Sequence, residues 1–172
     1  MHTGHKHEGF TLLETVFALS MLLIVAAGIM PLGLMAVKTT ENQGHLAART
    51  TEYAQDKLEQ LMALSYGDSA TDTRVFPATD LNGSGLAVGG SSDPNAPVNL
   101  YVDYLDIDGN LIPAVNGAPN GWFYKRVWQV SIPAGKTNLK QITVTATVRV
   151  ASQGGVGDLP RSTVTSLKTS PF

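Results

Sequence analysis

The stretch GFTLLETVFALSMLLIVAAGIMPLGLMAV, residues 9–37, decides the architecture of this chain. It carries one charged side chain, Glu14, and the 23 residues from Thr15 to Val37 carry none. A helix of roughly 20 apolar residues crosses the hydrocarbon core of a bilayer, whereas the apolar region of a signal peptide needs only about 7–15 residues. The stretch therefore predicts a membrane-spanning helix.

Glu14 and Gly9 are the two unusual residues of this stretch. A carboxylate at membrane depth costs on the order of 2.5–3.5 kcal/mol, so it normally has a partner or a role. Gly9 has no side chain, so it leaves the backbone beside Phe10 open to close approach. Residues 1–9 are polar and have no apolar pattern, and we interpret them as a leader that is removed.

A polar leader that ends in glycine, followed by Phe-Thr-Leu-Leu-Glu and an apolar helix, resembles the cleavage and methylation signal of type IV prepilins and type II secretion pseudopilins. The resemblance implies that a prepilin peptidase cuts after Gly9 and methylates the new amino terminus, so that Phe10 becomes N-methylphenylalanine. It also implies that Glu14 pairs with the amino terminus of a neighbouring subunit. Such pairing suits a charge that is tolerated in apolar surroundings only with a partner.

The resemblance also predicts where the chain works. Residues 47–61, AARTTEYAQDKLEQL, are similar to the helix of minor pilins of the V type and minor pseudopilins of the I type, and residues 126–128 and 140–144 are more weakly similar to their C-terminal strands. We expect a single-pass inner-membrane protein with its head in the periplasm. An inner-membrane assembly platform would add it to a type IV pilus, at the cell surface, or to a type II secretion pseudopilus. It would pack there by parallel helices against other pilins or pseudopilins, near the tip or as a priming subunit.

The apolar stretch opens a helix that we expect to run from residue 10 to about Tyr66, where Gly67 provides a stop. Residues 10–37 form its membrane and assembly half, and residues 38–66 its amphipathic half. The expected packing face of the second half carries Ala47, Ala54, Leu58, Leu61 and Met62. The opposite, polar face carries Arg49, Glu52, Asp56 and Lys57. Pro31 lacks an amide proton and predicts a kink or local melting, although membrane helices also tolerate proline freely.

The remainder of the chain predicts an antiparallel head. Residues 67–97 are rich in Gly, Ser and Pro and are expected to form a flexible loop without a strong regular element. From residue 98 to 172 the period changes to two, with strands expected at 99–105, 122–132 and 142–150 and an edge strand at 162–169. The predicted fold class is therefore α+β, with a long N-terminal helix packed on a C-terminal antiparallel sheet, as in pilins.

Composition and motifs argue against other classes of function. The net charge of −2 gives no electrostatic footprint for nucleic acid, and the chain has no cysteine for a disulfide or a thiol nucleophile. His45 stands apart from the three histidines of the leader, so no nucleophile and base come together and no enzyme is expected. A solvated cationic leader is also a simpler interpretation of His2, His5 and His7 than a metal site. No cofactor or metal is expected.

Two further segments have a functional and a structural interpretation. Residues 106–110 resemble a calcium loop, but Leu111 stands where the EF-hand needs glycine and Gly117 where it needs glutamate, which favours a hairpin turn. The aromatic and basic residues of 122–128 either form a strand with aromatic side chains inward and cations at the rim, which we favour, or a stacking platform. The second interpretation describes an alternative function, a membrane-anchored DNA-capture or adhesin head.

Overall fold

The computed structural model describes residues 11–113, 117–149 and 160–170. Gly9, Phe10 and the predicted leader lie outside these residues. The chain divides into two units, residues 1–42 and 43–172. One helix, α1 (Leu12–Ala63), contributes its first part to the first unit and its second part to the second.

The first part of α1 is apolar and exposed. Every residue from Thr11 to Lys38 is exposed, including large side chains such as Phe17 and Leu23. By length and composition this helix is able to cross a membrane. Thr11 begins it, because its carbonyl oxygen accepts hydrogen bonds from the backbone N–H groups of Glu14, at 3.0 Å, and Thr15, at 3.2 Å.

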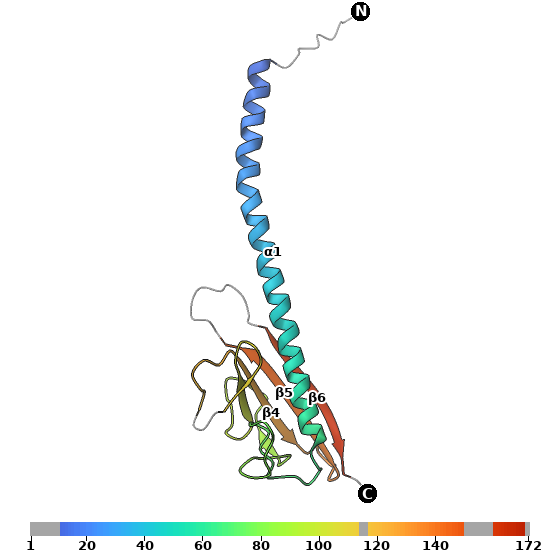
Figure 1. The fold of residues 1–172 in the computed structure, drawn as a ribbon. Helices are drawn as coiled ribbons and strands as arrows, with labels where there is room; N and C mark the ends of the chain where they lie inside the picture. The colour runs from blue at the N-terminus through green and yellow to red at the C-terminus, as the bar shows by residue number, and fades with distance from the viewer. Residues whose placement is uncertain (1–10, 114–116, 150–159, 171–172) are drawn as a thin grey trace, which may run out of the picture. The chain divides into compact units, whose positions relative to one another are not determined.

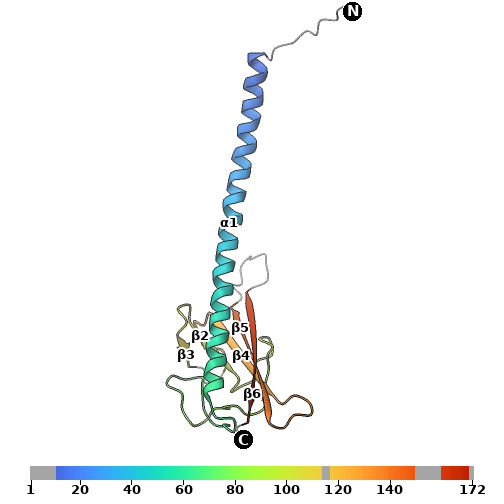
Figure 2. The same cartoon turned by 90° about the vertical axis from the view of Figure 1, so that its right-hand side faces the viewer.

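The second unit is built on an antiparallel sheet. Its strands are β1 (Gly89–Gly90), β2 (Val102–Leu105), β3 (Leu111–Ile112), β4 (Tyr124–Ser131), β5 (Leu139–Val148) and β6 (Arg161–Thr169). They lie in the order β3-β2-β4-β5-β6, and β1 pairs with β4. Residues 43–63 of α1 lie across one face of this sheet (Figures 1 and 2). The expected α+β fold is confirmed.

Alternation along the strands separates a face toward α1 from an outer face. The face toward α1 carries the buried side chains Tyr124, Trp128, Ile142, Val144 and Ala146, and α1 adds Tyr53, Ala54 and Leu61 to the same core. Burying each large apolar side chain contributes about 1.5–3 kcal/mol. Leu58 and Met62 pack at the margin of this core, as the helical period predicts, whereas Ala47 is exposed and lies outside the packing face.

The end of the helix and the segment that follows it differ from the expectation. The segment 67–97, expected to have no strong regular element, contains the short strand β1 and an isolated bridge between Asp72 and Thr79. The helix ends at Ala63, before Tyr66. Its last turn has no basic residue, but two strand lysines reach its end: Lys168 donates to the carbonyl oxygen of Met62, and Lys140 donates to that of Tyr66 at 2.7 Å. Cations are favoured where a helix leaves its last carbonyl groups unpaired.

Candidate functional site

A buried lysine on α1 joins the helix to the sheet and to the loop that follows the helix. Lys57 is fully buried, and its Nζ lies 2.9 Å from Oδ2 of Asp103 on β2. The same ammonium group donates to the carbonyl oxygen and to the hydroxyl oxygen of Thr73, both at 2.7 Å. It also lies 4.2 Å from the centre of the Trp128 ring, within the range of a cation–π contact.

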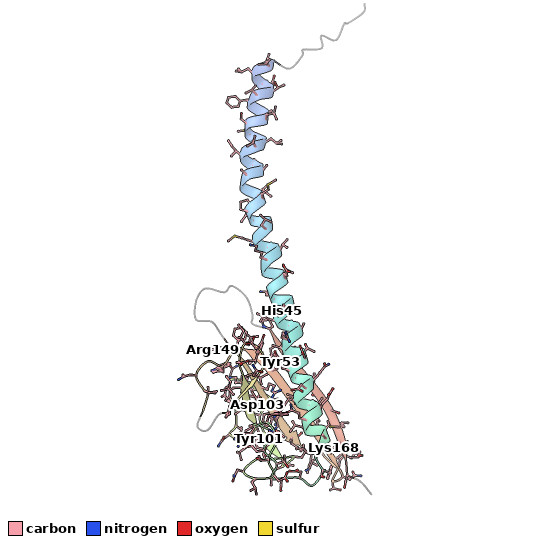
Figure 3. All side chains as sticks on the ribbon, viewed as in Figure 1. His45, Tyr53, Tyr101, Asp103, Arg149 and Lys168 are labelled. Carbon is pink, nitrogen blue, oxygen red and sulfur yellow. The ribbon has the colours of Figure 1, made fainter. Side chains whose placement is uncertain are left out.

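Arg126 on β4 is the second cation of this cluster. Its Nε and Nη2 donate to the two oxygens of Asp103, at 2.8 and 2.9 Å, which is the planar fork typical of arginine and carboxylate. Its Nη1 donates to Oδ2 of Asp56 at 2.9 Å. Asp103 is labelled in Figure 3 together with Tyr53 of α1. We name Lys57, Asp103, Arg126 and Asp56 the charge cluster.

Asp103 compensates both buried cations. Burial acts to raise the pKa of Asp103, but the charges of Arg126 and Lys57 and their hydrogen bonds hold that pKa below its ordinary value. Burial, and to a smaller extent the charge of Arg126, lower the pKa of Lys57 to about 8 against the attraction of Asp103. A buried charge is costly when a partner is removed, so each member of the cluster depends on the others.

The structure corrects two sequence-based predictions about this cluster. Lys57 was predicted on the polar face of the helix, and the cations of residues 122–128 at the rim of a strand, but Lys57 and Arg126 are both buried. The sequence does contain a signal for each. Lys57 follows Ala54 by three residues and precedes Leu61 by four, so it shares their face. Arg126 lies between Tyr124 and Trp128 at the strand period of two.

The indole nitrogen of Trp128 is buried and has no hydrogen-bond partner among the described residues. Leaving such a donor unpaired costs about 1–3 kcal/mol. The ring is nevertheless held from two sides, by the Lys57 ammonium and by Tyr101, whose ring centre lies 6.3 Å from that of Trp128. The contacts of Trp128 therefore use its aromatic ring and leave its N–H group unpaired.

A groove of about 680 Å³ opens beside the charge cluster. Its walls come from the end of α1, the loop at residues 73–78 and the β2–β3 hairpin. Apolar side chains such as Leu64, Leu105 and Leu111 line it, and Phe76 at its margin is 92% exposed. The arginine at its floor, Arg126, is already paired with two carboxylates, so the groove is an apolar surface with its charges satisfied.

The β2–β3 hairpin confirms the turn interpretation of residues 106–110. Oδ1 of Asp106 accepts the backbone N–H groups of Asp108, at 2.9 Å, and Asn110, at 2.8 Å, and the carboxylate is thereby used within the turn. Gly109 has a φ of 90°, and a Cβ placed there would lie 2.3 Å from the hydroxyl oxygen of Tyr53. Glycine is therefore required both by the turn and by the helix packed against it. No group of three or more potential metal ligands occurs in the described ranges.

The aromatic and basic residues of 122–128 split between the two faces of the sheet. Tyr124 and Trp128 face α1, as predicted, whereas Trp122 is half-buried elsewhere and packs edge-on against Tyr104 at 5.5 Å. Lys125 and Arg149 lie 5.7 and 5.4 Å from the Trp122 ring. The Lys125 ammonium donates to the carbonyl oxygen of Pro94. These contacts hold Trp122, Tyr104, Lys125 and Arg149 together within the head.

The residues predicted for processing and assembly all belong to the first unit. Glu14 is exposed in the first turn of α1, where a carboxylate favours the helix dipole, and it has no ion partner among residues 11–170 as far as the structure describes them. Helix α1 is unbroken at Pro31, so the helix does not melt there, and the kink stays a prediction. Gly9 and Phe10 lie outside the described residues.

Comparison of the chain with protein-family models, with curated proteins and with solved structures gives no match.

Proposed function

We propose that this chain is a minor pilin or pseudopilin, processed by a prepilin peptidase and assembled through its helix into a type IV pilus or a type II secretion pseudopilus. The observation that carries the proposal is the two-part character of α1. Up to Val37 its first part is exposed and carries no charge except Glu14, and its second part is buried against the sheet by Tyr53, Lys57 and Leu61. One helix thus serves both a membrane or filament core and a folded head.

Glu14 supports an assembly role more than a simple anchor. A purely anchoring helix gains nothing from a carboxylate, which costs free energy in an apolar environment. In a bundle of parallel helices the same carboxylate has a use, because the cationic amino terminus of a staggered neighbour compensates it. In this proposal the pair acts as a check of register between subunits.

The first test is the mass of the mature chain. The full-length chain is produced in a cell with and without a prepilin peptidase, and membrane fractions are analysed by intact-mass measurement. We expect a product that begins at methylated Phe10 only when the peptidase is present. Gly9→Arg provides the matched control, because a long charged side chain blocks access to the scissile bond, and this variant should stay uncut. Processing at another bond, or none, contradicts the proposal.

The alternative of an anchored DNA-binding head is tested separately. Affinity for single-stranded DNA would fall with salt, with a slope that counts the phosphates neutralised by Lys and Arg side chains. Lys125→Gln and Arg149→Gln should then each reduce that slope. An assembly subunit predicts no saturable DNA binding in either the parent chain or the variants.

A further inference from the structure

The outer edge of β6 is an unpaired strand edge. In the part of the chain that the structure describes, β6 pairs only with β5 and is last in the strand order. The pairing keeps one register from Leu139↔Thr169 to Thr147↔Arg161, so the strand contains no bulge. Figure 1 shows β6 in red at the side of the sheet.

The register determines which backbone groups of β6 point outward. Along an antiparallel strand, alternate residues bond to one neighbour and the residues between them face the other way. Ser170 N–H donates to the carbonyl oxygen of Asn138 at 2.9 Å, in continuation of the β5–β6 register. Even-numbered residues therefore bond to β5. The outward N–H and C=O groups belong to Arg161, Thr163, Thr165, Leu167 and Thr169.

Along most of its length, the edge of β6 is without the features with which proteins block strand addition. Such features are prolines, bulges and charged side chains. Strand β6, RSTVTSLKT, has no proline. Its lysine, Lys168, is engaged with the carbonyl oxygen of Met62, and the other charge, Arg161, stands at the first position. The seven residues between them and after them are Ser, Thr, Val and Leu, most of which favour strands.

Helix α1 runs along β6 and defines the surroundings of an added strand. The Ser162 hydroxyl oxygen lies 2.7 Å from that of Thr51, and Lys168 reaches Met62 further along. Thr51, Leu58 and Met62 share one helix face at intervals of seven and four residues. Leu58 and Met62 are only partly buried. Alternate side chains of an added strand would meet this apolar margin, and the others would continue the exposed threonines of the outer face.

We propose that the free edge of β6 accepts an extended segment of a different polypeptide, which adds a strand to the sheet. Among the conformations of a bound peptide, the extended strand is the one that pairs successive outward N–H and C=O groups of such an edge. The fitting segment alternates apolar residues, which pack against Leu58 and Met62, with β-branched polar residues beside Thr163 and Thr165. This inference does not require the pilin assignment: it depends on the sheet and, for the choice of partner, on the part of α1 that is able to cross a membrane.

A second copy of this chain fits the edge less well. Antiparallel pairing of two β6 strands points their α1 helices in opposite directions, whereas copies inserted alike in one membrane point the same way. Parallel pairing in register sets Arg161 beside Arg161 and Lys168 beside Lys168, and like charges directly opposite are destabilising. The expected partner is therefore a different chain.

The test uses the full chain in detergent micelles and a synthetic peptide, LKQITVTAT, the sequence of residues 139–147. This peptide has the proposed alternation, with Ile142, Val144 and Ala146 on one side. Amide hydrogen exchange is followed residue by residue. In the free chain, the amides of Thr163, Thr165 and Leu167 should exchange rapidly, and saturating peptide should slow them by about tenfold or more.

Two controls separate backbone pairing from other binding. Thr165→Pro removes one outward N–H and leaves the β5–β6 bonds intact, because proline is accepted where the N–H of an edge strand faces solvent. Thr165→Val keeps the N–H. We expect the proline variant to lose peptide protection and the valine variant to retain it. A peptide N-methylated at alternate residues should give no protection to the parent chain, which tests the pairing without altering the head.

Three results would overturn the proposal. The first is protection of the outward amides in the absence of peptide. Protection at all protein concentrations means that the chain covers its own edge, and protection that rises with protein concentration means that a second copy covers it. The second is the absence of protection by the peptide. The third is equal protection by the N-methylated peptide.

Discussion

Lys57 on α1 and Asp103 on β2 form an ion pair of 2.9 Å in which neither side chain reaches solvent. The pair does not stand by itself, since Asp103 also receives the fork of Arg126. One carboxylate thus holds two cations between the helix and the sheet. The second carboxylate of the charge cluster, Asp56, is half exposed and forms an ion pair with one of the two cations, Arg126. Asp103 is therefore the residue on which the junction depends most.

This asymmetry predicts unequal losses of stability. Asp103→Asn removes the carboxylate that two buried cations share, leaves Lys57 without its ion partner, and should lower the free energy of unfolding by about 3–5 kcal/mol. Lys57→Met leaves Asp103 paired with Arg126 and removes the donor to Thr73, so we expect about 1–3 kcal/mol. Urea unfolding of the full chain in micelles, followed by tryptophan fluorescence, measures both.

Arg49→Met is the matched control for these two variants. It breaks a pair with Glu52 on the same helix, but both partners are largely exposed, so the change should stay within about 0.5 kcal/mol. Equal losses for the Asp103 and Lys57 variants would contradict the unequal roles assigned to them.

The lowered pKa of Lys57 predicts a dependence of stability on alkaline pH. With a pKa of about 8 in the folded protein and 10.5 for an ordinary lysine, the unfolded chain binds more protons between these values. The free energy of unfolding should therefore rise with pH from about 8 toward 9.5, by on the order of 1 kcal/mol per pH unit. Lys57→Met should reduce this rise.

The pH series should end near 9.5, because burial raises the pKa of Tyr104 and Tyr124 and these groups act in the opposite direction at higher pH. Stability that falls between about pH 8 and 9.5 in the parent chain, or an unchanged slope in Lys57→Met, would show that Lys57 does not titrate as described.

Two shortened chains test whether the helix belongs to the head. A chain that begins at Ala47 keeps Tyr53, Ala54, Lys57 and Leu61 in the core, and should be a soluble, monomeric α+β domain. A chain that begins at Gly67 exposes the apolar face of β4 and β5 and leaves Asp103 without Lys57, so it should aggregate. Circular dichroism and size-exclusion chromatography compare them. If the shorter chain folds equally well, the second part of α1 is not part of the core.

Glu14→Ala tests the assembly role. The variant should insert into the membrane at least as well as the parent, because a carboxylate is costly there, and it should still be processed. Its incorporation into filaments should fall. Glu41→Ala, which changes an exposed carboxylate further along α1, should be incorporated normally. Immunoblots of sheared filaments against membrane fractions measure the ratio, and normal incorporation of Glu14→Ala would remove the pairing argument.

The sequence predicts the fold well where one period dominates. The uncharged run before Lys38 predicts the exposed part of α1, and the alternation at residues 142–148 predicts β5 with Ile142, Val144 and Ala146 on its buried side. The charge cluster was missed because charge usually indicates an exposed face. Lys57 and Arg126 follow the periods of their apolar neighbours, but only the fold reveals that Asp103 stands opposite both.

The reach of Lys168 to Met62 has a consequence for how the protein is made. The two residues are 106 positions apart, and Ser162 contacts Thr51 over a similar separation, 111 positions. A ribosome therefore releases α1 long before it releases β6, the strand whose lysine bonds to the end of α1. Contacts so distant in sequence form late, because a long loop must close first. Synthesis of the apolar first part of α1 thus precedes completion of the head, and until β6 is made the end of α1 lacks its contacts with that strand.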